Sequence, residues 1–139
     1  DMDLSTDVSF IERFITLLGE YHIVVGSKSV GSQRRPFLRK LASDVFILLA
    51  RVLLGLRFKD YSISAKGYLR NSVVDMMDKV DSGSFYVVTF LYYGKKKGLK
   101  CIEYPVDCHD VRKSKFNIPY EAVYRLRCIL SLRFFGRVI

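Results

Sequence analysis

Helical and extended segments alternate along this 139-residue chain, and this alternation limits its fold more than any other feature. Apolar residues recur at helical spacing over residues 8–18 and predict an amphipathic helix. Ser5, Thr6 or Asp7 is available as its N-terminal cap, and Gly19 is suited to end it. A short β-branched segment, residues 22–25, follows and predicts a buried strand that ends at Gly26.

The same alternation continues to the end of the chain. Apolar periodicity predicts helices over residues 36–54, 72–80, 85–97 and 120–135, and strands within residues 57–70 and 99–106. Asn71 is the expected cap of the helix over residues 72–80. Helices that alternate with strands indicate an α/β layered domain. About three strands are few for a free-standing sheet of this class, so we expect the fold to begin before residue 1.

The charge of the chain indicates anionic partners. Lys and Arg total 23 against 14 Asp and Glu, which gives a formal net charge of +9. Nucleic acid, a phosphorylated ligand and an acidic membrane surface all fit this excess. Cys101, Cys108 and Cys128 have neither C-x-x-C spacing nor an even number, so we expect reduced thiols in a cytosolic setting rather than a disulfide framework or a zinc knuckle.

Two apolar segments raise the question of membrane contact. The longest, residues 45–56, contains Arg51 and is shorter than the roughly 20 residues that a membrane span needs, so it is a core helix or an interfacial one. The final segment interleaves arginines with aromatic residues. It fits a helix that rests on an anionic membrane surface, and equally an amphipathic helix packed on the domain.

Several short motifs occur in a recognisable order. They are D-M-D-L-S-T-D at residues 1–7, V-V-G-S-K-S at 24–29, R-K-L-A-S at 39–43, F-K-D-Y-S-I-S-A-K-G-Y-L-R at 58–70 and G-L-K-C-I-E-Y-P-V-D-C-H-D-V-R-K-S-K-F at 98–116. In order and spacing the chain resembles the second half of glycosyltransferase family 2 enzymes. Within that family it is most similar to the polyprenyl-phosphate (dolichyl-phosphate) mannosyl- and glucosyltransferases.

The resemblance implies a fold and a division of the chain. Residues 1–118 would be the second half of a GT-A mixed-sheet α/β domain flanked by helices, with the N-terminal nucleotide-binding strands absent. Residues 119–139 would form a basic amphipathic helix. Because half of the donor pocket would be missing, we expect the 139-residue piece alone to have little or no transferase activity.

The resemblance also implies a metal site at the start of the chain. Asp1 and Asp3 match the family's D-x-D motif, whose carboxylates hold a divalent cation, Mg²⁺ or Mn²⁺. Such a cation neutralises the charge that develops on a diphosphate leaving group. Asp3 is the expected direct ligand, and Asp1 is expected to contact the metal through water or to face the nucleotide.

Further site residues follow from the other motifs. The resemblance assigns donor and acceptor binding to Asp1, Lys28, Arg39, Ser43, Lys66, Ser114 and Lys115, and catalytic roles to Asp60, Lys66 and Arg39. A general base is not required, since a lipid monophosphate is largely ionised at neutral pH with a second pKa of about 6. Positioning and charge neutralisation are therefore expected to carry the catalysis.

The chain departs from the family pattern at several positions. Ser5 stands where a glutamine ligand is common, Lys28 replaces an arginine, and Thr89 stands where a carboxylate is common. Ile63 and Ser64 replace a Ser-Gly pair. A family member that has lost activity and persists as a scaffold is therefore one alternative, and a basic nucleic-acid-binding module is another.

The favoured interpretation remains an enzyme. It would transfer a hexose, with inversion and metal assistance, from a nucleotide-diphosphate sugar to a polyprenyl or dolichyl phosphate. The expected location is the cytoplasmic face of a membrane, to which the protein would bind peripherally.

Overall fold

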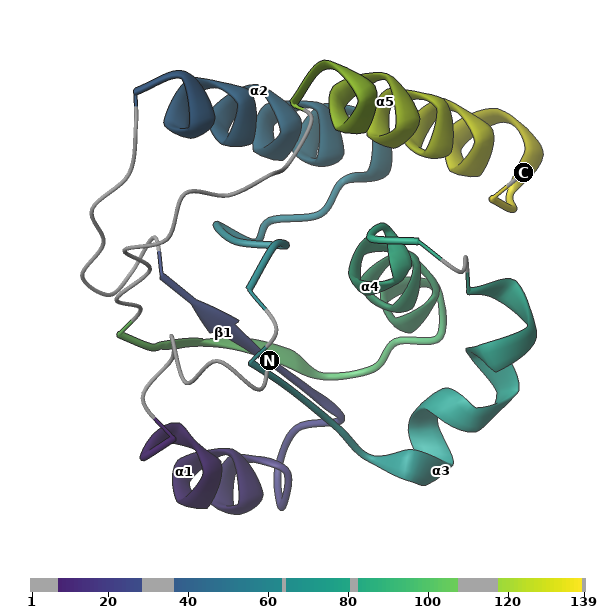
Figure 1. The fold of residues 1–139 in the computed structure, drawn as a ribbon. Coiled ribbons are helices and arrows are strands. Elements are labelled where there is room, and N and C mark those ends of the chain that lie inside the picture. The colour runs from purple at the N-terminus through teal and green to yellow at the C-terminus, as the bar shows by residue number, and fades with distance from the viewer. Residues whose placement is uncertain (1–7, 29–36, 64, 81–82, 108–117, 139) are drawn as a thin grey trace.

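A computed structural model describes residues 8–28, 37–63, 65–80, 83–107 and 118–138 of the chain. Its elements are α1 (Phe10–Leu17), β1 (Ile23–Ser27), α2 (Phe37–Leu54), β2 (Lys66–Tyr68), α3 (Arg70–Val73), the 3₁₀ helix η1 (Val74–Lys79), α4 (Tyr86–Lys96), β3 (Cys101–Pro105) and α5 (Ile118–Phe135). The protein is thus α/β, with a small mixed sheet flanked by helices (Figure 1).

The sheet has the strand order β2-β1-β3, with β1 in the centre. β1 and β2 are antiparallel, with Ile23 opposite Tyr68 and Val25 opposite Lys66. β1 and β3 are parallel, with Ser27 opposite Pro105 at their ends. The carboxyl ends of β1 and β3 therefore lie at one edge of the sheet, and β2 begins beside that edge.

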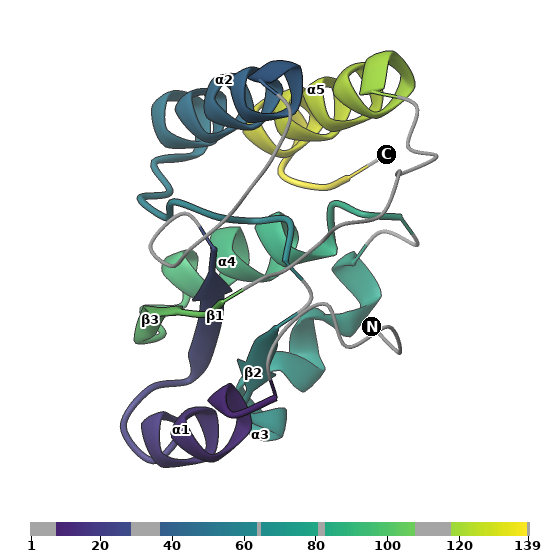
Figure 2. The ribbon, with the colours of Figure 1, turned by 60° about the vertical axis from the view of Figure 1, so that its left-hand side comes forward.

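The side chains of β1 alternate between two hydrophobic clusters, as the two-residue period of a strand requires. Val24 belongs to a cluster with Phe14 of α1, and this helix covers one face of the sheet. Ile23 and Val25 belong to a larger cluster that contains residues of α2, α4 and α5. α4 lies next to the second face, and α2 and α5 lie side by side as an outer layer (Figures 1 and 2).

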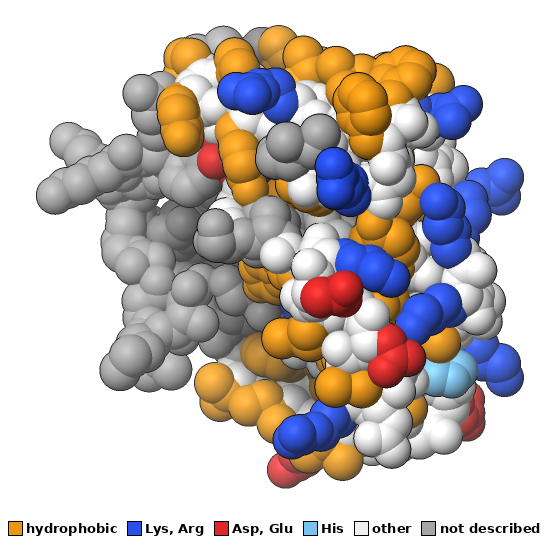
Figure 3. Space-filling view, turned by 90° about the vertical axis from the view of Figure 1, so that its right-hand side faces the viewer, with side chains coloured by type: hydrophobic (Ala, Val, Ile, Leu, Met, Phe, Trp, Pro, Cys, Tyr) orange, Lys and Arg blue, Asp and Glu red, His pale blue; other side chains and the backbone are white. Residues whose placement is uncertain are grey.

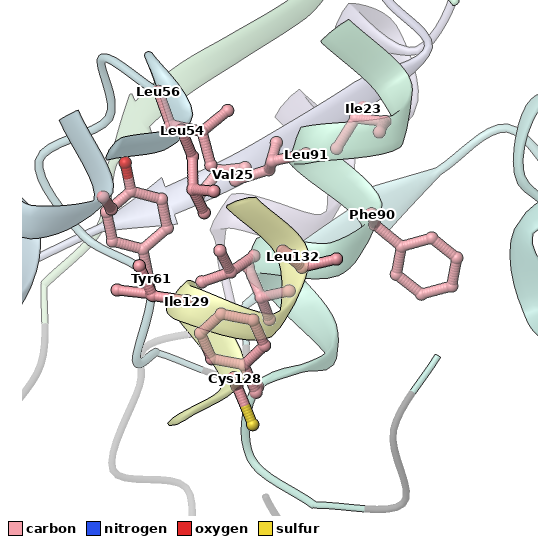
Figure 4. Close-up of a cluster of buried hydrophobic side chains, with 14 of the residues drawn as sticks. Ile23, Val25, Leu54, Leu56, Tyr61, Phe90, Leu91, Cys128, Ile129 and Leu132 are labelled. Carbon is pink, nitrogen blue, oxygen red and sulfur yellow. The ribbon is translucent and has the colours of Figure 1, made fainter. Parts of the chain in front are cut away.

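The outer helices contribute directly to the larger cluster. Its buried members include Phe46, Ala50 and Leu54 from α2, and Cys128, Ile129 and Leu132 from α5 (Figure 4). Arg125 of α5 lies over the ring of Phe46, with its guanidinium carbon 5.0 Å from the ring centroid, and its Nε donates to Glu121 at 2.6 Å. The C-terminal helix is therefore packed on the domain through one of its faces.

Glycines with positive φ follow three of the helices, and at Gly136, directly after α5, φ is +68°. Gly55 follows α2 with φ +67° and Gly98 follows α4 with φ +70°, a left-handed conformation that favours glycine. The carbonyl oxygen of Gly55 also accepts a hydrogen bond from Lys95 Nζ of α4, at 2.8 Å. The end of α2 is thus joined to α4 by a side chain as well as by the core.

Most of the predicted elements are confirmed, and three details of the sequence prediction are wrong. Asn71 is not a cap, because α3 begins at Arg70 with Leu69 as its N-cap and continues into η1. The cap position of α1 is occupied by Ser9, although Ser5, Thr6 and Asp7 themselves lie outside the described residues. The strand predicted within residues 57–70 is confirmed, although it has only the three residues of β2.

The third error concerns Gly26, which lies inside β1 rather than at its end. The close packing around this position leaves no room for a side chain. A Cβ atom at this position would lie 2.8 Å from both the Cβ and the carbonyl oxygen of Ala65, and 3.2 Å from a methyl group of Val106. The missing side chain allows the segment before β2 to approach the central strand.

No helix in the described part of the chain is both long enough and apolar enough to cross a membrane. Both long helices, α2 and α5, have one face in the core.

Substitution Gly26→Ala tests this close approach. The new methyl group would meet backbone, which cannot rotate away, so we expect the free energy of unfolding to fall by about 1–3 kcal/mol in urea denaturation. Gly94→Ala is the comparison, because its nearest new contact is the end of the Ile23 side chain at 3.2 Å. An equal loss in the two variants would contradict the explanation.

Candidate anion-binding site

Four charged residues from separate parts of the chain gather at the carboxyl edge of the parallel strands. Lys28 follows β1, Asp60 lies in the loop after α2, Lys66 opens β2 and Glu103 is in β3. Ligands of α/β proteins commonly bind outside the carboxyl ends of strands, because side chains from several loops converge there. We call these four residues the charged cluster.

Asp60 is the centre of the cluster and is only 2% exposed. Its Oδ1 accepts hydrogen bonds from the backbone N–H and the hydroxyl of Ser62, at 2.8 and 2.9 Å. Its Oδ2 accepts from the backbone N–H of Lys28 at 3.2 Å and lies 3.9 Å from Lys28 Nζ. The carboxylate therefore joins the loop after β1 to the loop after α2.

Glu103 holds the same loop from the other side. Its Oε1 accepts from the backbone N–H groups of Lys59 and Asp60, at 2.7 and 3.0 Å. A carboxylate that accepts two backbone donors fixes the position of those amides. No role was predicted for Glu103 from the sequence. The signal that could have indicated one is its place within the motif at residues 98–116.

Lys66 lies in a less favourable environment for a cation. Its pKa is lowered from 10.5 to about 8, mainly by burial and also by the charge of Lys28, while Asp60 and Glu103 act in the opposite direction. Its Nζ donates a hydrogen bond to the carbonyl oxygen of Ile63. Lys28 is itself only 5% exposed. Each of these two cations therefore feels the charge of the other, and both are at least partly removed from water.

This arrangement can bind an anion. The oxygens of Asp60 and Glu103 already accept backbone hydrogen bonds, so these carboxylates also serve to shape the loops. An anion placed near Lys28 and Lys66 would reduce the repulsion between the two cations. An ammonium carries three donors and binds a phosphate as a point charge.

Ser27, which sequence reasoning passed over, adds a polar group next to the cluster. It is fully buried at the end of β1, and its hydroxyl has no hydrogen-bond partner among the described residues. A buried polar atom of this kind normally requires a partner. The signal in the sequence was its place between Gly26 and Lys28.

The remaining predicted site residues are not brought to this cluster by any described contact. Ser43 is partly buried on α2. Asp1, Asp3, Ser114 and Lys115 lie outside the described residues, as does the side chain of Arg39. Thr89 is fully buried in α4, and its hydroxyl has no partner in the described part of the chain.

The described residues contain no group of three or more His, Cys, Asp or Glu side chains that could hold a metal ion. The predicted ligands of Mg²⁺ or Mn²⁺, Asp1 and Asp3, are not among the residues searched.

Comparison of the chain with models of protein families, with curated proteins and with solved structures finds no match. The function of the chain is therefore inferred from the geometry of the site and from the motifs of the sequence.

Removal of the Glu103 carboxylate tests its role in the loop. In Glu103→Ala two backbone N–H groups lose their acceptor, and we expect the free energy of unfolding to fall by about 1–3 kcal/mol. Glu103→Gln keeps an acceptor oxygen and should lose less. Glu20→Ala, at an exposed position, is the control. Urea denaturation measures the free energy of unfolding of all three variants. If Glu103→Gln lost as much of it as Glu103→Ala, the result would count against the two hydrogen bonds.

The lowered pKa of Lys66 predicts a pH dependence of stability. Between about pH 8 and 10.5 the unfolded chain binds more protons at this residue than the folded protein, so the destabilising effect of the buried charge decreases as pH rises. We expect the stability of Lys66→Met relative to the unsubstituted protein to be highest below pH 8 and to decline up to pH 10.5.

Denaturation in urea at pH 7, 8, 9 and 10 measures this difference. Lys100→Met, which removes an exposed lysine, is the control for loss of a lysine as such. A stability difference for Lys66→Met that is constant across this range would show that the lysine is not buried as described.

Proposed function

We propose that the charged cluster binds the phosphate groups of a hexosyl transfer reaction, from a nucleotide-diphosphate sugar to a polyprenyl or dolichyl phosphate. The observation that carries the proposal is a pair of lysines, Lys28, which is buried, and Lys66, which is partly buried, at the carboxyl edge of β1 and β3. Both belong to motifs that resemble those of family 2 glycosyltransferases, and the fold is a mixed sheet flanked by helices.

The reaction needs charge neutralisation more than proton transfer. An oxygen of the lipid phosphate attacks the anomeric carbon of the sugar, and the bond from that carbon to the diphosphate oxygen breaks with inversion. The bonding electrons remain on the departing nucleoside diphosphate. Lys28 and Lys66, held by the protein before the substrate arrives, stabilise this developing negative charge. No proton has to leave the lipid phosphate, because it is already ionised.

Asp60 takes a different role in this proposal from the catalytic one first expected. Its two oxygens accept hydrogen bonds from Ser62 and Lys28, so it acts as a positioning residue for the lysines. Glu103 positions Asp60 in turn. A divalent cation, when bound, would neutralise the diphosphate as well, and no step described here depends on it.

A lipid phosphate acceptor would place the reaction at a membrane surface. We propose peripheral binding at the cytoplasmic face, consistent with the net charge of +9.

The proposal is tested on the longest natural form of the protein, because the 139-residue piece alone is expected to have little or no transferase activity. The transfer assay uses a panel of nucleotide-diphosphate sugars and a short polyprenyl phosphate, with Mn²⁺ and with EDTA. Lys28→Met and Lys66→Met should each lower the rate of transfer by about tenfold or more, as expected for loss of one charged contact to the transition state. Lys100→Met is the control of equal charge change.

Circular dichroism of each variant separates loss of function from loss of fold. Unchanged transfer in both folded variants, or binding of no donor in calorimetry by the unsubstituted protein, would overturn the proposal.

A further inference from the structure

The outer layer of the protein presents an apolar face that no described segment covers. α2 and α5 lie side by side, and the core-facing residues of both helices enter the same hydrophobic cluster. Their opposite faces therefore point to the same side of the molecule. Figure 3 shows hydrophobic side chains gathered over the upper part of the protein, where the two helices lie in Figure 1.

On α2 the exposed apolar residues form one stripe. They are Leu41, Val45, Leu48 and Val52, at spacings of four, three and four residues. Such spacings place side chains on one face of a helix. The buried residues of α2 lie on the opposite face, so the stripe points away from the core. The sequence is compatible with a core helix or an interfacial one, and α2 has one face in the core and an exposed apolar stripe on the other.

On α5 a second stripe has the same character. It consists of Val123, Leu126, Leu130 and Phe134, at spacings of three, four and four residues, opposite the buried Cys128, Ile129 and Leu132. An apolar surface of two adjacent stripes is much larger than the scattered exposed residues of an ordinary protein surface. A contiguous apolar surface of this kind indicates a binding partner.

Basic side chains flank both stripes. By helical geometry Arg127 and Arg133 lie on either side of the α5 stripe, and both are exposed. Lys40 and Arg51 lie along one side of the α2 stripe, together with the acidic Asp44. Arg125, by contrast, is turned to the core side of α5, where it contacts Phe46 and Glu121.

We infer that the face formed by the two stripes and their basic flanks, the α2/α5 face, docks on the surface of a bilayer that contains anionic phospholipids. Apolar side chains enter the boundary between headgroups and acyl chains, and the flanking cations contact phosphate groups. Because the two helices lie side by side in one layer, both stripes can contact a flat surface such as a bilayer at the same time.

The charges that flank the two stripes favour a membrane over a second copy of the chain as the partner. Two such faces would bring Arg127 and Arg133 of each copy against cations of the other, which is unfavourable. The inference rests on surface geometry and does not depend on the sugar chemistry. Vesicle binding without donor or metal can therefore succeed or fail separately from the transfer reaction.

The test is flotation of the full chain with vesicles of phosphatidylcholine alone or with about 30% phosphatidylserine. We expect binding that is stronger to the anionic vesicles. The double variant Val52→Ser/Phe134→Ser should weaken it about tenfold, because two apolar contacts are lost. These side chains are 70% and 73% exposed, so the fold should survive their replacement.

A matched control removes the same kind of residue elsewhere. Ile15 on α1 and Met77 on η1 are 67% and 60% exposed, and Ile15→Ser/Met77→Ser should bind vesicles like the unsubstituted protein. Arg127→Glu/Arg133→Glu should lose about tenfold or more in binding to anionic vesicles only, against Lys100→Glu as control. Equal losses in the face and control variants would overturn the inference.

A second measurement uses the absence of tryptophan from the chain. A single tryptophan introduced by Val52→Trp or Phe134→Trp should shift its emission to the blue on vesicles and be quenched by brominated lipid. Ile15→Trp should show neither effect. Quenching that is equal at all three positions, or self-association without vesicle binding in sedimentation, would refute docking through this face.

Discussion

The whole structure depends on the central strand β1, which is buried on both of its faces. Val24 packs with α1 on one side, while Ile23 and Val25 pack with the cluster that holds α2, α4 and α5 on the other. Both edges of β1 are also paired, with β2 and with β3. A strand with no free edge and no exposed face needs β-branched residues and, at Gly26, no side chain at all.

The end of this strand also determines where buried charge can be tolerated. Charges taken out of water need partners, and those of Asp60 come from the backbone of Lys28 and from Ser62 rather than from a close ion pair. Most of these partners are backbone groups, so the loops themselves hold the carboxylate in place. The proposed binding of an anion would need such a fixed arrangement.

The sequence predicts the long elements of the fold well and the site only in part. Helices α2, α4 and α5 are long apolar-rich segments, and Gly55 and Gly98 mark where two of them stop. β2 has three residues, too few for a periodic signal. The contacts of Asp60 and Glu103 join positions 32 to 44 residues apart through backbone donors, which no local pattern encodes. The roles of Lys28 and Lys66 rest on resemblance to a family and on chemistry.

The hydrogen bond from Lys95 to the carbonyl oxygen of Gly55 gives the outer layer a mechanical property. It places a cation from α4 at the negative end of α2, and only five residues, 55–59, separate Leu54 from Asp60. Such a short, anchored connection leaves little room for a hinge. Any surface that fixes the orientation of α2 therefore also fixes the tilt and the height of the charged cluster above that surface.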